Sequence, residues 1–141
     1  MYYLRELMRL QPTTRRKANN VQKITQELFD IGLTEKAERF RAVKIAIYSF
    51  ECDCRLRNAE LIGSALLNVT ELKLLRLRYI KSAEWSNVFA TFGYSRSRTK
   101  NIHIGAIRKI AAANPDADFK ALYETERRRI DELLAQVGEK I

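Results

Sequence analysis

The chain has 141 residues, the usual length of one domain, and its 46% hydrophobic and 30% charged residues exclude default disorder and allow a packed core. With only two prolines and five glycines, the composition favours long helices over a many-turned β fold. The net charge of +9 is concentrated in residues 70–114, which hold nine basic and two acidic residues. Such a local excess indicates a polyanionic partner.

The N-terminal region is predicted to begin with a loop and a helix. Residues 11–17 (QPTTRRK) are polar and basic and include Pro12, so we expect a loop that leads into a helix beginning near Thr14. Apolar residues then recur at steps of three and four: Val21, Ile24, Leu28 and Ile31. We expect Gly32 to end this helix and Thr34 to cap the next one.

A second helix is predicted from about residue 35 to well past Phe50. Its apolar stripe is formed by Ala37, Phe40, Val43, Ile47, Phe50 and Cys54. The pattern allows the helix either to continue to Leu67 or to break near Asn58. Cys52 and Cys54 would point to different sides of this helix and lack the spacing of a zinc site, so we interpret them as reduced thiols of a cytosolic protein.

Residues 70–114 are predicted to form three helices. Thr70 is expected to cap a helix over 71–80, and a short helix follows over 85–92. Gly93 provides a turn, Ser95 an N-cap, and the third helix reaches about Ala113 before Asn114-Pro115. A short helix, a glycine turn and a capped basic helix are typical of a helix-turn-helix, whose second helix enters the major groove of DNA.

The third helix of this region has two predicted faces. Thr99, Ile102, Ala106, Ile107 and Ile110 should face the core and meet Leu72, Leu75, Val88 and Phe92. The residues expected to contact DNA at its start are Arg96, Ser97, Arg98, Lys100 and Asn101. Arginine can read guanine with two hydrogen bonds, and asparagine can read adenine. The residues expected to contact phosphate are Lys73, Arg76, Arg78, Arg108 and Lys109.

The last helix is predicted to start near Asp116 or Asp118, because acidic residues stabilise a helix N-terminus. Phe119, Tyr123, Glu126, Ile130, Leu133 and Val137 follow at steps of four and three, the heptad period, and Gly138 ends the pattern. Two interpretations stay open at this point. The stripe either forms the seam of a homodimer or packs on its own domain.

Two separated stretches resemble the fourth region of bacterial sigma factors. Residues 69–79 (VTELKLLRLRY) are similar to its opening helix, and residues 93–110 (GYSRSRTKNIHIGAIRKI) are similar to its glycine turn and recognition helix. The resemblance covers about one third of the chain. It implies reading of a promoter element and contact with bacterial RNA polymerase, with Arg96, Ser97, Arg98, Lys100 and Asn101 at the DNA-reading positions and Arg108 at a position that activators touch.

We therefore predict an all-α fold with a helical N-terminal region (1–69), a sigma-region-four-like helix-turn-helix (70–114) and a C-terminal amphipathic helix (115–141). Residues 1–69 are too short for the promoter-melting domain of a complete sigma factor, and the layout resembles small regulators of phages and mobile elements. The expected function is sequence-specific binding of double-stranded DNA and activation of transcription with host polymerase. The alternatives are the small subunit of a phage DNA-packaging motor and a polymerase- or sigma-binding protein without a DNA site of its own.

Other classes of function lack support in the sequence. No phosphate loop, nucleophile motif or metal-ligand spacing occurs, so we expect no enzymatic activity, no cofactor and no metal site. His103, the only histidine, is expected to be a surface or phosphate contact. The apolar runs are too short for a membrane span or a signal peptide, which predicts a cytoplasmic protein, at the nucleoid or in a host cell.

Overall fold

A computed structural model describes all 141 residues and contains six helices and no strand, which confirms the all-α prediction. The helices are α1 (Tyr2–Asp30), α2 (Thr34–Gly63), α3 (Val69–Tyr79), α4 (Trp85–Phe92), α5 (Arg96–Ala113) and α6 (Phe119–Ala135). The bounds of α4 and α5 agree with the prediction, and the side chains of Ser95 and Asp118 cap α5 and α6 as expected.

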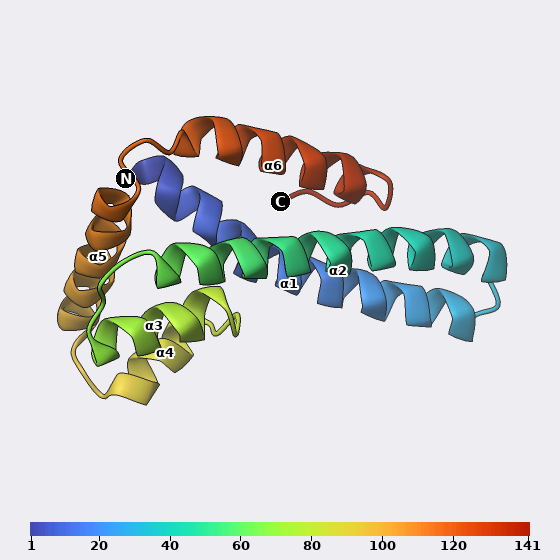
Figure 1. Cartoon of the computed structure of the whole chain (residues 1–141). Coiled ribbons are helices and arrows are strands. Elements are labelled where there is room, and N and C mark those ends of the chain that lie inside the picture. Colours follow the sequence, from blue (N-terminus) through green and yellow to red (C-terminus); the bar gives the residue numbers. More distant parts are fainter.

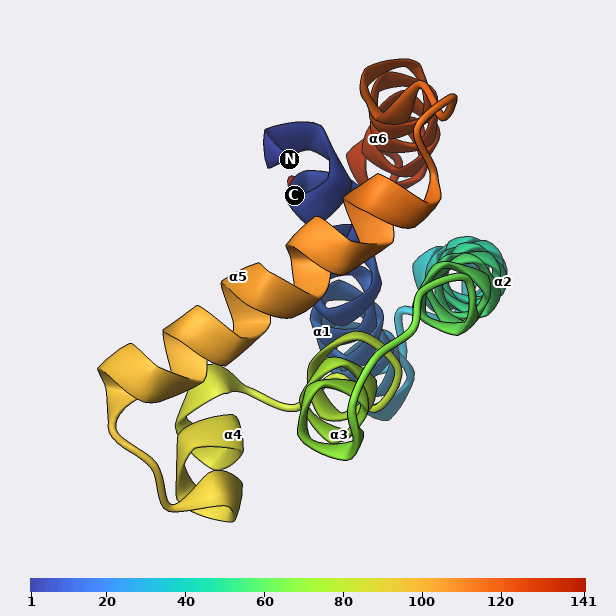
Figure 2. The ribbon, with the colours of Figure 1, turned by 60° about the vertical axis from the view of Figure 1, so that its left-hand side comes forward.

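The long helices α1 and α2 form an antiparallel hairpin that sets the shape of the molecule (Figure 1). Helix α6 lies along this hairpin and contacts both of its helices. Helices α3, α4 and α5 gather at the end of the hairpin where α1 begins and α2 ends. Figure 2 shows α5 crossing this end, from α4 at its start to the neighbourhood of α6 and the N-terminus at its end. Residues 70–114, predicted as a helix-turn-helix, are thus built against the base of the hairpin.

The predicted loop at residues 11–17 is wrong, because α1 is continuous through Pro12. A proline inside a helix removes the N–H that would bond the carbonyl four residues earlier, here that of Met8. The buried side-chain amide of Asn58 on α2 donates to this Met8 carbonyl at 3.0 Å. A partner from another helix therefore satisfies the oxygen that the proline leaves free.

The same Asn58 amide also connects α2 to α3. Its Nδ2 also donates to the carbonyl of Tyr79, at the end of α3, at 2.9 Å. Asn58 is fully buried and does not break α2, which continues to Gly63 and ends before Leu67. One side chain thus joins α1, α2 and α3 at a single point.

Two predicted caps are displaced by one or two residues. Asn68, not Thr70, caps α3: its Oδ1 accepts from the backbone N–H of Glu71, whose carboxylate accepts from the N–H of Asn68 in return. This reciprocal capping box satisfies two N–H groups at once, which explains the earlier start. Thr34 is the first residue of α2 and makes no cap, since Leu33 precedes it without a side-chain acceptor.

Two hydrophobic clusters form the core. The first joins the start of α1 and the end of α2 to α3, α4 and α5, and it contains Leu4, Met8, Ile62, Leu74, Leu75, Tyr79, Val88, Ala106, Ile107 and Ile110. The second joins α1, α2 and α6, and it contains Leu7, Leu10, Ala18, Val21, Ile47, Phe50, Cys54, Ile130 and Leu134. The first cluster crosses the predicted border at residue 69, and the second joins residues 1–69 to residues 115–141, so the three predicted parts do not have separate cores.

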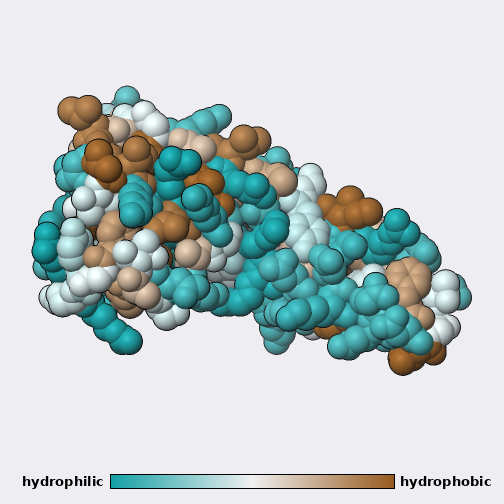
Figure 3. Space-filling view, turned by 90° about the horizontal axis from the view of Figure 1, so that it is seen from below, coloured by the Kyte–Doolittle hydropathy of each residue, from teal (hydrophilic) through white to brown (hydrophobic).

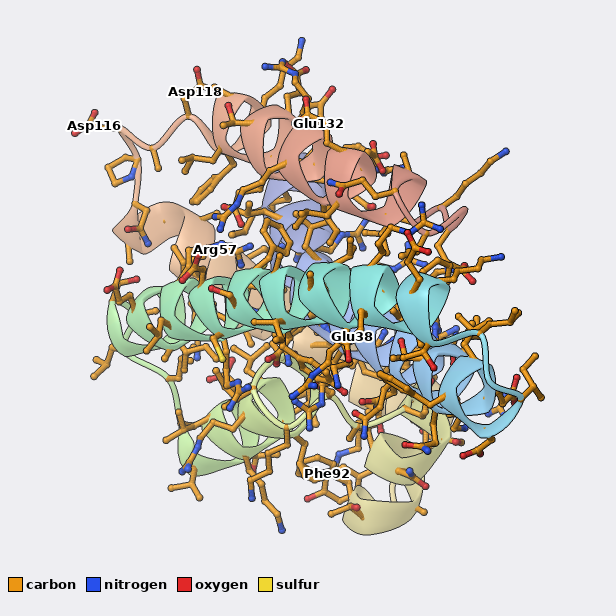
Figure 4. All side chains as sticks on the ribbon, turned by 90° about the vertical axis from the view of Figure 1, so that its right-hand side faces the viewer. Glu38, Arg57, Phe92, Asp116, Asp118 and Glu132 are labelled. Atoms are coloured by element: carbon orange, nitrogen blue, oxygen red, sulfur yellow. The ribbon has the colours of Figure 1, made fainter.

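The heptad stripe of α6 packs on its own chain, which is the second of the two interpretations left open by the sequence. Ile130 is fully buried in the second cluster, and Phe119, Tyr123, Leu133 and Val137 pack against it. An ion pair closes the contact, since Arg57 Nη2 of α2 lies 2.7 Å from Glu126 Oε1 (Arg57 is labelled in Figure 4). The stripe is therefore already covered within one molecule.

The far end of the hairpin is narrow and mainly hydrophilic, with apolar side chains at its tip (Figure 3). Ile31, which was expected in the core stripe, is 70% exposed there because α1 has already ended. Cys52 is exposed, whereas Cys54 is buried, and burial raises the pKa of the Cys54 thiol to about 12. No helix has both the length and the apolar character needed to cross a membrane.

The two hydrogen bonds of Asn58 predict that its substitution lowers the free energy of unfolding, by an amount that depends on whether residue 12 is proline. Asn58→Leu leaves the carbonyls of Met8 and Tyr79 buried without a donor, and each such group costs about 1–3 kcal/mol. We expect urea unfolding of this variant to show a free energy of unfolding lower by roughly 2–4 kcal/mol.

Pro12→Ala supplies the matched second variant, because it restores an N–H that can bond the Met8 carbonyl within α1. In the Pro12→Ala, Asn58→Leu double variant, part of the loss should be recovered. Strict additivity of the two single changes would contradict the coupling between the proline and the asparagine.

Candidate nucleic-acid interface

Helices α4 and α5 and the turn between them are held in place by local caps and by the shared core. Gly93 adopts φ 65° between α4 and α5, a left-handed conformation that favours glycine. The side chain of Ser95 accepts from the backbone N–H of Arg98 at 3.1 Å and starts α5. Val88 of α4 and Ile107 of α5 are fully buried in the first cluster, so the orientation of α5 is fixed by packing.

One face of α5 is buried and the opposite face is free. The buried side chains are Thr99, His103, Ala106, Ile107 and Ile110, and Ile102 is half-buried beside them, as predicted for all but His103. Successive helical residues are turned by about 100°. The exposed residues most opposite to the buried face are therefore Ser97, Asn101, Arg108 and Ala112. These four residues form the outer stripe of α5.

Two arginines at the start of α5 are supported by aromatic rings. The guanidinium of Arg96 lies 5.4 Å from the ring centre of Phe89, and that of Arg98 lies 3.9 Å from the ring centre of Tyr94. Such stacking favours a cation over a π face and narrows the positions that its long side chain samples. Lys100 is exposed and makes no ion pair.

The predicted phosphate contacts differ in whether their charged groups are exposed or already paired within the chain. Arg76 and Arg108 are exposed and form no ion pair. Lys109 Nζ instead lies 2.6 Å from Oε1 of the buried Glu71, so its charge is already balanced. Arg78 donates to the carbonyl of Ala83 at 3.0 Å, and burial lowers its pKa. The structure thus gives Lys109 and Arg78 roles inside the fold.

The expectation that His103 is a surface contact is wrong. Its ring is buried, shares a 2.8 Å hydrogen bond with the hydroxyl of Tyr79 through Nε2, and meets the ring of Trp85 edge-on. Burial lowers the pKa of His103 to about 4, and the nearby charges of Arg5 and Arg78 act in the same direction. The side chain is therefore neutral at pH 7 and links α3, α4 and α5.

Sequence analysis missed a second basic row, on α1. Arg5, Arg9 and Arg16 are exposed and recur at steps of four and seven, which places them on one side of the helix. They lie close enough to α3 and α5 to affect the pKa values of Arg78, Tyr79 and His103. Their spacing is visible in the sequence, but the predicted loop at 11–17 hid the helix that carries them.

A cavity of about 510 Å³ lies between this α1 row and helices α3, α4 and α5. It is lined by Arg5, Glu6, Arg9, Tyr79, Trp85, Phe89, Lys100, His103 and Ile104. No group of three or more histidine, cysteine, aspartate or glutamate side chains is arranged to hold a metal ion.

Comparisons with protein-family models, with curated proteins and with solved structures find no match. The geometry of the chain itself is therefore the basis for a functional proposal.

The neutral, buried His103 predicts a pH-dependent stability. Its pKa in the folded state is about 4, below the unfolded value of 6.5, so the unfolded state binds the proton first as pH falls. Stability should be full above pH 6.5 and decrease by roughly 2–3 kcal/mol towards pH 4.

Because His103 is the only histidine, its ring proton resonances measure this pKa directly. We expect no titration above pH 5 by NMR. A His103→Gln variant is the control and should lose the pH dependence between pH 7 and 5.5. A midpoint near 6.5 in the folded protein would contradict the buried placement.

Proposed function

We propose that the chain binds double-stranded DNA by inserting α5 into the major groove, and that it regulates transcription. The observation that carries this proposal is the outer stripe of α5, with Ser97 and Asn101 in its N-terminal half and cationic side chains on both flanks. Residues 85–115 contain no aspartate or glutamate, so no acid of α4, the turn or α5 opposes these cations. A phosphate-rich partner suits this surface.

Each side chain has a role that its chemistry suits. Asn101 lies on the outer stripe, where its amide would donate to and accept from an adenine edge. Arg96 and Arg98, each stacked on an aromatic ring, would reach guanine or the flanking phosphates with little loss of side-chain entropy. Ser97 would contact either base edges or phosphate, and Lys100 would bind phosphate.

The exposed Arg76 of α3 and Arg108 of α5 complete the proposed footprint as phosphate contacts. Such contacts set orientation and contribute most of the salt-dependent affinity. Activation of promoters with host RNA polymerase is the finer form of the proposal. It is supported by the resemblance of residues 69–79 and 93–110 to the fourth region of sigma factors.

A binding protein for polymerase or a sigma factor is the second candidate, and one observation favours it. An apolar patch lies where α2 leads into α3, with Leu66 95% and Val69 82% exposed. Leu72 belongs to this patch and not, as predicted, to the core against α5, because its side chain is 38% exposed and lies outside the first cluster. Exposed apolar residues that gather in this way are typical of protein contacts. This candidate predicts copurification with polymerase and no salt-sensitive affinity for DNA.

Base reading by Asn101 is tested by selecting bound duplexes from a random pool with the parent and with Asn101→Ala. The parent should enrich a motif, and the variant should lose preference at one position of that motif, at a cost of about 1–3 kcal/mol for the preferred base. Arg41→Ala, on the exposed side of α2, is the control and should return the parental motif. Unchanged selection by Asn101→Ala would show that this side chain does not read a base.

Substitutions of two neighbouring cations, Arg108 and Lys109, distinguish a DNA contact from an ion pair within the fold. Arg108→Gln should weaken binding to all duplexes and reduce the slope of log affinity against log salt by about 1, because one phosphate contact is lost. Lys109→Gln should change that slope little and lower the free energy of unfolding on the order of 1 kcal/mol, because Glu71 loses its partner.

Fluorescence anisotropy at several salt concentrations and urea unfolding measure the two effects, with Arg41→Gln as a charge-matched control. The reverse pattern, a slope change for Lys109 but not for Arg108, would invert the assignment of the α5 faces.

A further inference from the structure

The cavity between α1, α4 and α5 has one aromatic wall and one cationic rim. Trp85 and Phe89 of α4 and His103 of α5 line the wall. Arg5 and Arg9 of α1 and Lys100 of α5 line the rim from two sides. Aromatic walls with a few convergent charged groups are typical of small-ligand sites, whose volumes are about 300–1,000 Å³. The 510 Å³ of this cavity falls in that range.

The wall is held in place before any ligand arrives. His103 is bonded to the Tyr79 hydroxyl at 2.8 Å, and its ring centre lies 4.9 Å from that of Trp85. Trp85 in turn packs against Phe89 at 6.0 Å and under the guanidinium of Arg78 at 5.1 Å. A wall fixed in this way loses little entropy on binding. Because His103 is neutral at pH 7, the wall adds no charge of its own.

The rim carries an excess of positive charge that the fold does not use. Glu6 is the only acidic side chain of the lining, and its carboxylate lies 3.7 Å from Arg9. Arg5 and Lys100 have no ion-pair partner. Like charges that converge on one cavity disfavour each other, and an anion between them removes this cost.

We propose that this cavity binds a small planar aromatic anion of the mononucleotide class, with its ring against Trp85 and Phe89 and its phosphate between Arg5, Arg9 and Lys100. The ring gains contact with the aromatic wall, and the phosphate accepts charge-assisted hydrogen bonds from the rim. Lys100 also flanks the outer stripe of α5, so an occupied cavity would withdraw one cation from DNA. That last consequence rests on the proposed function, whereas the ligand site does not.

Trp85 is the only tryptophan of the chain, so its fluorescence reports on the cavity alone. The full-length protein is titrated without DNA with adenosine 5′-monophosphate, adenosine and inorganic phosphate, and calorimetry of the same mixtures detects binding that leaves the fluorescence unchanged. We expect saturable binding of the monophosphate, at least about tenfold tighter than binding of adenosine or phosphate, because only the monophosphate engages both the wall and the rim.

Arg5→Gln, Arg9→Gln is the diagnostic double variant, and Arg39→Gln, Arg41→Gln on the exposed side of α2 is its charge-matched control. The diagnostic variant should bind the monophosphate at least about tenfold more weakly, and the control should bind like the parent. No binding of the monophosphate by either method, equal affinity for adenosine, or unchanged affinity in the diagnostic variant would each overturn the proposal. Because DNA is absent, a failure here is distinct from a failure of the proposed DNA binding.

Discussion

The side-chain amide of Asn58 donates to the Met8 carbonyl of α1 and the Tyr79 carbonyl of α3, and the rest of the structure depends on this junction. Pro12 creates the need for the first bond, because it leaves the Met8 carbonyl without an intrahelical donor. A buried carbonyl without a hydrogen-bond donor destabilises the folded state. The stability of α1 with Pro12 in its interior therefore depends on Asn58 of α2.

The same junction positions the basic surface. Tyr79 receives the Asn58 bond at its carbonyl and shares a second bond, through its hydroxyl, with His103 of α5. A polar connection thus runs from α1 through α2 and α3 to the helix that carries the outer stripe. Since His103 is neutral and buried, it orients α5 without adding charge. The base of the hairpin therefore acts as the scaffold on which the proposed DNA-reading helix and the neighbouring cavity are both built.

Local signals in the sequence were sufficient to predict the bounds and the buried face of α5. The Ser95 cap and the left-handed Gly93 determine where α5 starts, and both are readable from neighbouring residues. The apolar spacing of Thr99, Ala106 and Ile110 likewise placed the buried face of α5 correctly. Caps and periodicity are short-range properties, so one sequence is enough to find them.

The features that could not be predicted from the sequence depend on contacts between residues far apart along the chain. Pro12 breaks a helix by default, and only Asn58, on another helix, makes it tolerable. His103 and Lys109 look like surface groups on a basic helix until Tyr79 and Glu71 are brought against them. The stripe of α6 is compatible with a dimer until the groove between α1 and α2 is known to receive it.

The most direct test of the central claim is chemical protection of the DNA bases in a complex with a selected duplex. Methylation at guanine N7 probes the major groove, and methylation at adenine N3 probes the minor groove. The account predicts that the protein protects guanine N7 atoms within the selected site and leaves adenine N3 atoms reactive. Protection confined to adenine N3, or no protected base in a stable complex, would contradict the insertion of α5 into the major groove.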